Sequence, residues 1–289
     1  MKMGLLEFSR TTPGIDPHAA VLKLVASAQR ADELGFSRYW LAEHHEVGIA
    51  QGSPEVMATL VAAHTERIRV GCAGVLISHA CPLRTAKAFR LLQTAYPGRI
   101  DVGVAAGRAP PEVAAAFAVA APASREALRE RIEALARCVA GATSFPIHPE
   151  PAAAPELWIL GSGSAATARL AGELGASFSL SLFASGQPAS PSTIDEYRAA
   201  FRPSYWGREP CWNIAVAGIC ADTDAQAQRL GALLPQTSAV RAHTVGSVES
   251  WRDSLSSIAA EYQAEEVIFA DLCASLEQRV RSCELLATI

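Results

Sequence analysis

Segments typical of buried strands alternate with segments typical of amphipathic helices along this 289-residue chain. Each strand-like segment is a short apolar run, and apolar residues at helical spacing follow it. This alternation predicts β-α-β units and a parallel sheet, because parallel strands need a long crossover between them. The predicted strands cover residues 3–9, 38–42, 68–77, 99–107, 156–163, 177–183, 212–221 and 265–272.

Eight strand and helix units in 289 residues are typical of a (β/α)8 TIM barrel, whose usual length is about 250 residues. We therefore predict the α/β class, with one barrel domain over residues 1–289. An open, doubly wound parallel sheet is the alternative. The Pro- and Ala-rich segment 142–155 is predicted to be a surface connection, and 235–250 has no clear period.

Start and stop signals support the predicted helices. Ser53 reads as an N-cap, Pro54 as the first helical residue and Glu55 as an acid in the first turn. Gly35 and Gly175 follow two other helices as stop signals. One predicted helix begins at residue 53. The others cover residues 21–34, 82–95, 125–140, 164–174, 193–201, 224–234, 248–262 and 275–287.

Composition restricts the partners and the compartment. The chain is 50% hydrophobic and 19% charged, with a net charge of −4, which argues against nucleic acid or an anionic membrane as a partner. We expect no transmembrane helix, because no apolar stretch approaches about 20 residues, and no signal peptide, because the N-terminus turns polar early. Seven cysteines without a CxxC pair indicate reduced thiols in a cytoplasmic protein and no zinc site.

The stretch "YWLAEHHE" (39–46) ends the second predicted strand in a cluster of ionisable residues. The active site of a barrel lies at the carboxyl ends of its strands, so Glu43 and His44 are candidate catalytic residues. Adjacent residues of a strand point to opposite faces, which disfavours a metal site formed by His44 and His45. A core histidine satisfied by Glu43 or Glu46 is the structural alternative.

Two further segments end strands with residues suited to an anion. "LGSGSAAT" (160–167) joins a predicted strand to a predicted helix, as in loops that bind phosphate with backbone amides. A glycine-rich turn with a serine cap explains the same residues. Arg108 in "GVAAGRAPP" suits a phosphate or carboxylate, and His79 ends the third predicted strand as a pocket candidate; ordinary loop residues are the alternative for both.

Together these segments resemble the bacterial luciferase-like flavin-dependent monooxygenase family. The resemblance covers most of the chain and is strongest over 37–111 and 155–183. It implies a (β/α)8 barrel that binds FMN, or in related branches a deazaflavin, at the carboxyl ends of the strands, and a homodimer. It is carried by "YWLAEHHEVG", "GSPEVMATLVAAHTERIRVGCAGVLISHACPLRTAKAF", "YPGRIDVGVAAGRAPP", "LWILGSGSAATARLAGELGA" and "YRAAFRPS".

The resemblance also implies roles for individual residues. His44, with Glu43 behind it, matches the pocket histidine that acts near the flavin. Phe8, Trp40 and His79 would line a substrate pocket, in which Phe8 and Trp40 shield the flavin. Arg108 resembles an arginine that pairs with the flavin phosphate, although Pro111 replaces a family glycine nearby. The other positions matched to the cofactor site are Ala73 and Gly74, at a non-proline cis peptide, and Gly161, Ser162, Gly163, Ser164 and Thr167, in the phosphate loop.

The implied activity is that of a monooxygenase of secondary metabolism. Reduced FMN from a separate flavin reductase would react with dioxygen to form a C4a-peroxyflavin, which would oxygenate a small organic or carrier-bound substrate. The chain is short for the family before its last strand, so we expect an open pocket. The alternatives are a deazaflavin-dependent oxidoreductase, disfavoured by scattered basic residues, and a non-catalytic flavin-binding protein, disfavoured by Glu43 and His44. A metal-dependent barrel hydrolase would need more ligands than His44 and His79.

Overall fold

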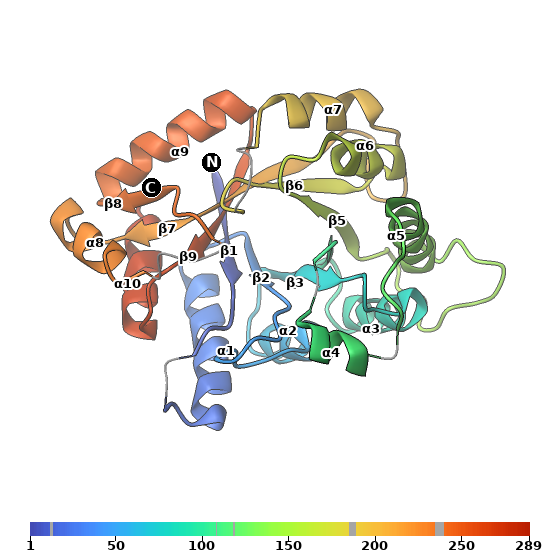
Figure 1. Cartoon of the computed structure of the whole chain (residues 1–289), viewed down its shortest axis with the longest axis horizontal. Helices are drawn as coiled ribbons and strands as arrows, with labels where there is room; N and C mark the ends of the chain where they lie inside the picture. The colour runs from blue at the N-terminus through green and yellow to red at the C-terminus, as the bar shows by residue number, and fades with distance from the viewer. Residues whose placement is uncertain (12–13, 108, 118, 185–188, 235–239) are drawn as a thin grey trace.

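The strands of the computed structural model close into a barrel with helices around it (Figure 1). The model describes residues 1–11, 14–107, 109–117, 119–184, 189–234 and 240–289. Its strands are β1 (Lys2–Glu7), β2 (Arg38–Leu41), β3 (Arg69–Leu76), β4 (Ile100–Ala105), β5 (Glu156–Gly161), β6 (Ser177–Ser181), β7 (Trp212–Cys220), β8 (Thr244–Gly246) and β9 (Glu266–Asp271).

Every neighbouring pair in the barrel is parallel. Strands β1 to β7 follow one another in sequence order, β9 pairs with β7, and β9 also pairs with β1 to close the circle. The short β8 lies outside this circle and pairs with the carboxyl end of β7, where Gly218 faces Thr244. The closed circle confirms the predicted (β/α)8 barrel and excludes the open sheet.

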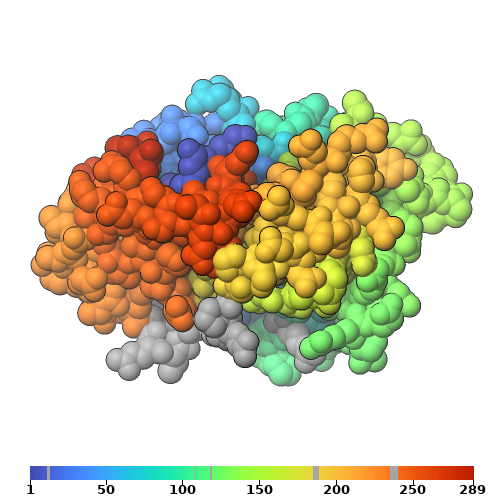
Figure 2. Space-filling model, turned by 90° about the horizontal axis from the view of Figure 1, so that it is seen from above, coloured from blue at the N-terminus to red at the C-terminus, as the bar shows by residue number. Residues whose placement is uncertain are grey.

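Helices follow the strands and cover the outside of the barrel (Figure 1), and Figure 2 shows α9 and α7 side by side across one face. The segment between α5 and β5 projects from the barrel, as predicted for the connection 142–155. The helices are α1 (Pro17–Glu33), α2 (Pro54–Ala63), α3 (Pro82–Ala95), α4 (Pro111–Ala116), α5 (Arg125–Ala140), α6 (Ala165–Leu174), α7 (Ser192–Ala200), α8 (Asp224–Gly231), α9 (Val248–Tyr262) and α10 (Leu276–Leu286).

Alternation along the strands divides the apolar side chains into two cores. On β2, Tyr39 and Leu41 point outward and pack in the large core between the strands and the helices. Trp40 and Ala42 point inward and join a smaller core inside the barrel. The ring of Trp40 meets Trp158 of β5 edge to face, with centroids 5.1 Å apart, so aromatic side chains fill the interior.

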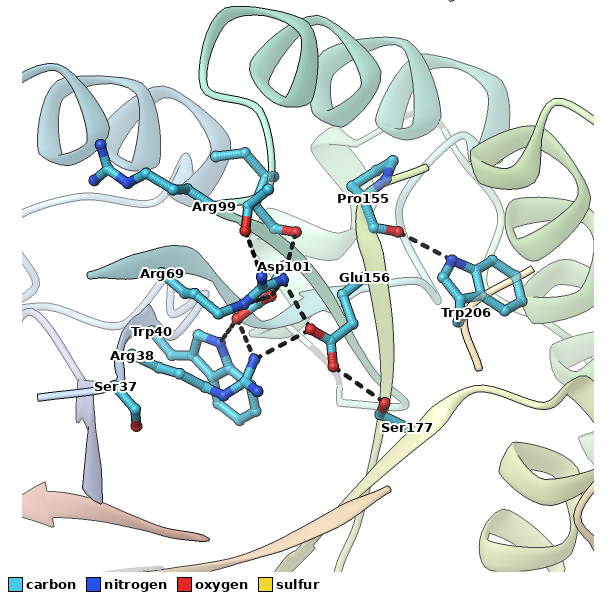
Figure 3. A network of polar contacts seen from close by, with 12 residues as sticks. Ser37, Arg38, Trp40, Arg69, Arg99, Asp101, Pro155, Glu156, Ser177 and Trp206 are labelled. Atoms are coloured by element: carbon cyan, nitrogen blue, oxygen red, sulfur yellow. Dashed lines mark hydrogen bonds and ion pairs between the residues drawn. The ribbon is translucent and has the colours of Figure 1, made fainter. Parts of the chain in front are cut away.

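A network of ion pairs closes the amino end of the barrel (Figure 3). The fully buried Asp101 of β4 accepts hydrogen bonds from Arg38 Nη1 at 2.8 Å, from Arg69 Nε at 2.9 Å and from Trp40 Nε1 at 2.8 Å. Glu266 of β9 binds the other side of Arg38, at 2.8 Å. Glu156 of β5 pairs with Arg38 and Arg69, so the network links five strands at the end remote from the predicted site.

Candidate active site

Glu43 holds the carboxyl ends of β2 and β3 together. Its Oε2 accepts a hydrogen bond from the backbone N–H of Leu76 at 2.8 Å. Its Oε1 lies 2.9 Å from Nε2 of His45. The side chains of Glu43 and His45 are only 11% and 12% exposed, so both contacts are largely shielded from water. Glu43 therefore fixes the positions of His45 and of the end of β3.

His44 lies at the mouth of the barrel and has a different partner. Its Nδ1 is 3.2 Å from Oε2 of Glu46, and its ring meets Phe8 with centroids 5.6 Å apart. The structure thus corrects the expectation that Glu43 stands behind His44. Because successive residues of extended backbone point to opposite sides, Glu43 pairs with His45, and His44 pairs with Glu46.

The contact with Glu46 orients the imidazole of His44. Partial burial would raise the pKa of Glu46, but backbone hydrogen bonds and His44 outweigh it and lower that pKa. An ionised Glu46 accepts a hydrogen bond from Nδ1–H of His44, which turns Nε2 away from Glu46. No partner for Nε2 occurs in the described part of the chain. The arrangement suits a residue that accepts a proton from a bound ligand.

Aromatic rings form the wall beside His44. Phe8, which is 7% exposed, meets Phe183 edge to face with centroids 5.8 Å apart. Phe8 belongs to the core inside the barrel, so it stands where that core reaches the carboxyl end. The place of Phe8 beside a substrate pocket stays a prediction.

The structure corrects the placement of Trp40. Its side chain is 1% exposed and its Nε1 binds Asp101 in the network at the amino end. Trp40 therefore belongs to the packed interior below the mouth and does not line an open substrate pocket. The resemblance implied a place for Trp40 beside the flavin, but the depth of a residue in a barrel depends on how the strands are staggered.

His79 lies under the end of α4. Its ring stacks on Phe117 with centroids 5.5 Å apart, and the ring of His45 meets the same Phe117 edge to face at 5.1 Å. His79 is 6% exposed, and neither ring nitrogen has a hydrogen-bond partner among the described residues. Phe117 thus joins His45 to His79, and a substrate-binding role for His79 stays a prediction.

The loop after β5 turns directly into the N-terminus of α6. Gly163 has a φ of +111°, a conformation that favours glycine. Ser164 caps α6, with its side chain accepting a hydrogen bond from the backbone N–H of Thr167. Gly161 and Ser162 lead into this turn from the end of β5. The first amides of α6 therefore lie at the carboxyl end of the barrel, where an anion can reach them.

A cavity of about 350 Å³ adjoins this loop and is lined by Ser164 and Thr167. Arg125 and Arg129 of α5 line the same cavity. Arg129 is paired with two carboxylates, at 2.9 and 2.6 Å. Arg125 is exposed and has no ion-pair partner in the described residues. The residues that line the cavity thus include Ser164 and Thr167 with their hydroxyls, the guanidinium of Arg125 and the carboxylate of Glu126. The hydroxyls and the guanidinium are groups that can bind a phosphate.

Sequence reasoning did not identify Arg125, although a signal was present. A helix that follows a barrel strand begins at the carboxyl end of the sheet, so the first residues of a helix predicted at 125–140 lie near the loop after β5. Arg108, the arginine that was predicted for the phosphate, lies outside the described residues.

The peptide bond between Ala73 and Gly74 is cis, as the resemblance implied. Ala73 belongs to the core inside the barrel. A Cβ atom added to Gly74 would lie 2.9 Å from the backbone of Val104 and Ala105, which leaves room only for glycine. β3 and β4 therefore approach each other closely beside the cavity next to the phosphate loop.

Three comparisons relate the chain to known proteins. The family model described as luciferase-like monooxygenase matches residues 1–267. The uncharacterized protein YwcH of Bacillus subtilis (strain 168) is 32% identical over 99% of this chain and 98% of its own length. The crystal structure of apo-MsnO8 aligns with a TM-score of 0.89 at 31% identity, covering 99% of this chain and 97% of that chain.

Two more distant structures share the fold alone. The oxygenating constituent of 3,6-diketocamphane monooxygenase from Pseudomonas putida, in complex with FMN, aligns with a TM-score of 0.76 at 17% identity, covering 99% of this chain and 97% of that one. An F420-dependent secondary alcohol dehydrogenase aligns with a TM-score of 0.64 at 16% identity, covering 98% and 97%. The same barrel therefore holds either FMN or a deazaflavin in different proteins.

Proposed function

The chain belongs to the luciferase-like monooxygenase family, a family of oxidoreductases, and from that premise we propose that it binds reduced FMN and uses dioxygen to oxygenate a small organic or carrier-bound substrate. The observation that supports FMN most directly is the cavity beside the loop after β5. It offers one cluster of anion-binding groups at the mouth of the barrel, as the single phosphate of FMN requires.

The phosphate of FMN is held, in this proposal, by the first amides of α6, the hydroxyls of Ser164 and Thr167 and the guanidinium of Arg125. Ser164, Thr167 and Arg125 line one cavity together with Glu126, and Arg125 forms no ion pair with a described residue. A charge-assisted contact of this kind contributes about 1.5–3 kcal/mol. Bound in its reduced form, FMN supplies the electrons that activate dioxygen.

The residues around the mouth have separate tasks. His44 accepts or returns a proton through Nε2, because Glu46 occupies Nδ1. Phe8 and Phe183 exclude water on the same side, which limits the loss of activated oxygen as peroxide. Glu43 acts as a positioning residue through His45 and Leu76.

A separate reductase supplies the reduced flavin in this proposal, because the described helices and strands all belong to the barrel and its covering layer. We also propose that the enzyme acts in the cytoplasm, where its cysteines remain reduced. No helix in the described ranges has the length and apolar character needed to cross a membrane.

A second copy of the chain is the proposed partner at the face formed by α2 and α3. Val56 and Leu60 of α2 are 59% and 38% exposed, and Leu91 of α3 is 58% exposed. Val56 and Leu60 lie one helical turn apart, so they form one stripe on the outer side of α2. A symmetric dimer would bury this stripe against its own copy. Val56→Asp and Leu60→Asp should shift the sedimentation of the protein from dimer to monomer, whereas Val47→Asp, at an exposed loop position, should not.

The experiment that tests the proposed activity begins with an anaerobic titration of the protein with reduced FMN. The complex is then mixed with oxygenated buffer in a stopped-flow spectrometer. Tight binding followed by a slowly decaying spectroscopic species would support an oxygenase. Binding with immediate reoxidation would favour a non-catalytic flavin-binding protein, and no binding of FMN together with tight binding of a deazaflavin would overturn the choice of cofactor.

A further inference from the structure

A second cavity opens at the carboxyl end of the barrel between α1 and α10, which lie side by side (Figure 1). Its volume is about 230 Å³. Three cationic side chains line it: Arg10 after β1, Lys23 on α1 and Arg279 on α10. Among the described lining residues, Glu277 is the one acid, so cations outnumber acids on its wall.

Two of these cations have no counter-ion. Arg10 and Lys23 are exposed and form no ion pair within the described ranges of the chain. The guanidinium carbon of Arg10 lies 5.6 Å from the centre of the Phe8 ring, which orients the group without neutralising it. Thr12 and Pro13, which lie outside those ranges, carry no charge. The cavity therefore keeps a positive potential that attracts anions.

The third cation has an unused donor. Arg279 is 13% exposed at its side chain, and its Nη1 lies 3.3 Å from Oε1 of Glu7. Its Nε is buried and has no hydrogen-bond acceptor among the described residues. A buried N–H without an acceptor is unfavourable, and an oxyanion in the cavity would supply one.

The position of this cavity separates it from the proposed FMN phosphate site. The cavity lies beside β1 and β9, and the FMN phosphate cavity lies beside β4 and β5. Round the closed barrel, β5 is four strands from β1 in either direction. The two anion-binding cavities therefore lie on opposite sides of the mouth. Phe8 contacts both Arg10 and His44: its ring centre lies 5.6 Å from the guanidinium carbon of Arg10 and 5.6 Å from the ring centre of His44.

We propose that the cavity lined by Arg10, Lys23 and Arg279 binds a carboxylate or phosphate group of the substrate. This inference rests on the proposed monooxygenase function and names the class of its substrate. The oxyanion is held outside Phe8, and the reacting part of the same molecule extends past Phe8 to His44. FMN, held by its own phosphate on the opposite side, faces that part across the mouth.

The test uses the FMN-bound protein and ³¹P NMR. The phosphate of FMN gives its own resonance, so occupancy of the FMN site is read separately from binding of added inorganic phosphate. ¹³C-labelled acetate serves as the carboxylate probe in a parallel titration. The variant R10Q/K23Q is compared with R202Q/R252Q, which removes two exposed cations elsewhere and so matches the change in net charge.

We expect the native protein and R202Q/R252Q to broaden the NMR resonance of phosphate, of acetate or of both. The broadening caused by R10Q/K23Q should be at least five-fold smaller. Broadening of the phosphate resonance alone, or of the acetate resonance alone, would identify which oxyanion the site prefers. Equal broadening with R10Q/K23Q, or none with the native protein, would overturn the inference. So would a shift of the FMN resonance in R10Q/K23Q, because the cavity would then hold the cofactor. Absence of a bound FMN resonance would instead reveal failure of the proposed function.

Discussion

Oε1 of Glu43 lies 2.9 Å from Nε2 of His45, its neighbour but one in sequence, while the intervening His44 turns to Glu46. The two histidines of the same motif therefore have different environments. His45 is buried and fixed to the end of β3 through Glu43, whereas the side chain of His44 is 36% exposed at the mouth. The position of a histidine in this motif does not by itself show whether a carboxylate holds it inside the fold, as with His45, or whether it is exposed at the mouth, as with His44.

Glu43→Ala should destabilise the fold by about 2–4 kcal/mol, because the N–H of Leu76 and the ring of His45 lose their partner. Urea unfolding followed by circular dichroism measures the change. Glu46→Ala is the matched control, since that side chain is 58% exposed, and should cost less than about 0.5 kcal/mol. Equal losses for the two variants would show that Glu43 does not tie the strands together.

Arg125→Gln should weaken the binding of FMN about ten-fold or more, because it removes the unpaired guanidinium from the phosphate cavity. Arg129→Gln should change the affinity less than about three-fold, because Glu133 and Glu173 already occupy the Arg129 side chain. Fluorescence titration with FMN measures both. A larger effect of Arg129→Gln would mean that the cofactor displaces these ion pairs.

Asp101→Asn should lower the free energy of unfolding by about 3–5 kcal/mol, because it leaves Arg38 and Arg69 with less negative charge in a buried network. The affinity for FMN should not change, since Asp101 lies at the opposite end of the barrel. Glu196→Gln, which breaks an exposed pair with Arg169, should cost less than about 1 kcal/mol. Chemical denaturation with a parallel FMN titration separates the two effects.

Asp271→Asn should make stability depend less on pH. Burial raises the pKa of Asp271 to about 6, against opposing hydrogen bonds from Ser282 and Cys273. The folded protein therefore keeps a proton there that the unfolded chain releases near its ordinary pKa of about 4. This group lowers the free energy of unfolding as the pH rises from about 4 to 6.

At pH 8, Asp271→Asn should be more stable than the native protein by about 2–3 kcal/mol, and the difference should vanish below about pH 4. Thermal and urea unfolding across this pH range measure it. Asp222→Asn is the contrasting control, because hydrogen bonding to Arg281 lowers the pKa of Asp222, so its removal should destabilise the protein at pH 8. A pH-independent difference for Asp271→Asn would contradict the raised pKa.

The fold could be predicted closely from sequence because each barrel strand is an apolar run with a helix after it. The predicted strand 156–163 contains β5, and the predicted helix 82–95 matches α3. Two elements were not predicted. The six residues of α4 begin at Pro111, directly after Pro110, and neither α4 nor the three residues of β8 are long enough to show a period.

The site was predicted less completely, for geometric reasons. Strand ends could be identified, so Glu43, His44 and the loop after β5 were predicted to lie at the carboxyl end of the barrel, where the structure places them. Which carboxylate meets which histidine depends on side-chain direction beyond the strand, and the pairing of Glu43 with His44 was wrong. Arg125 comes from a different strand-helix unit than the loop that it faces, and a search of contiguous motifs does not connect the two.

The buried network around Asp101 also has a kinetic consequence. Because Arg38, Trp40 and their partners fill the amino end, a cofactor and a substrate bound as proposed would both enter and leave at the carboxyl end. Molecules that share one opening obstruct each other when they pass. A slowly released product should therefore delay the exchange of oxidised flavin for the next reduced flavin.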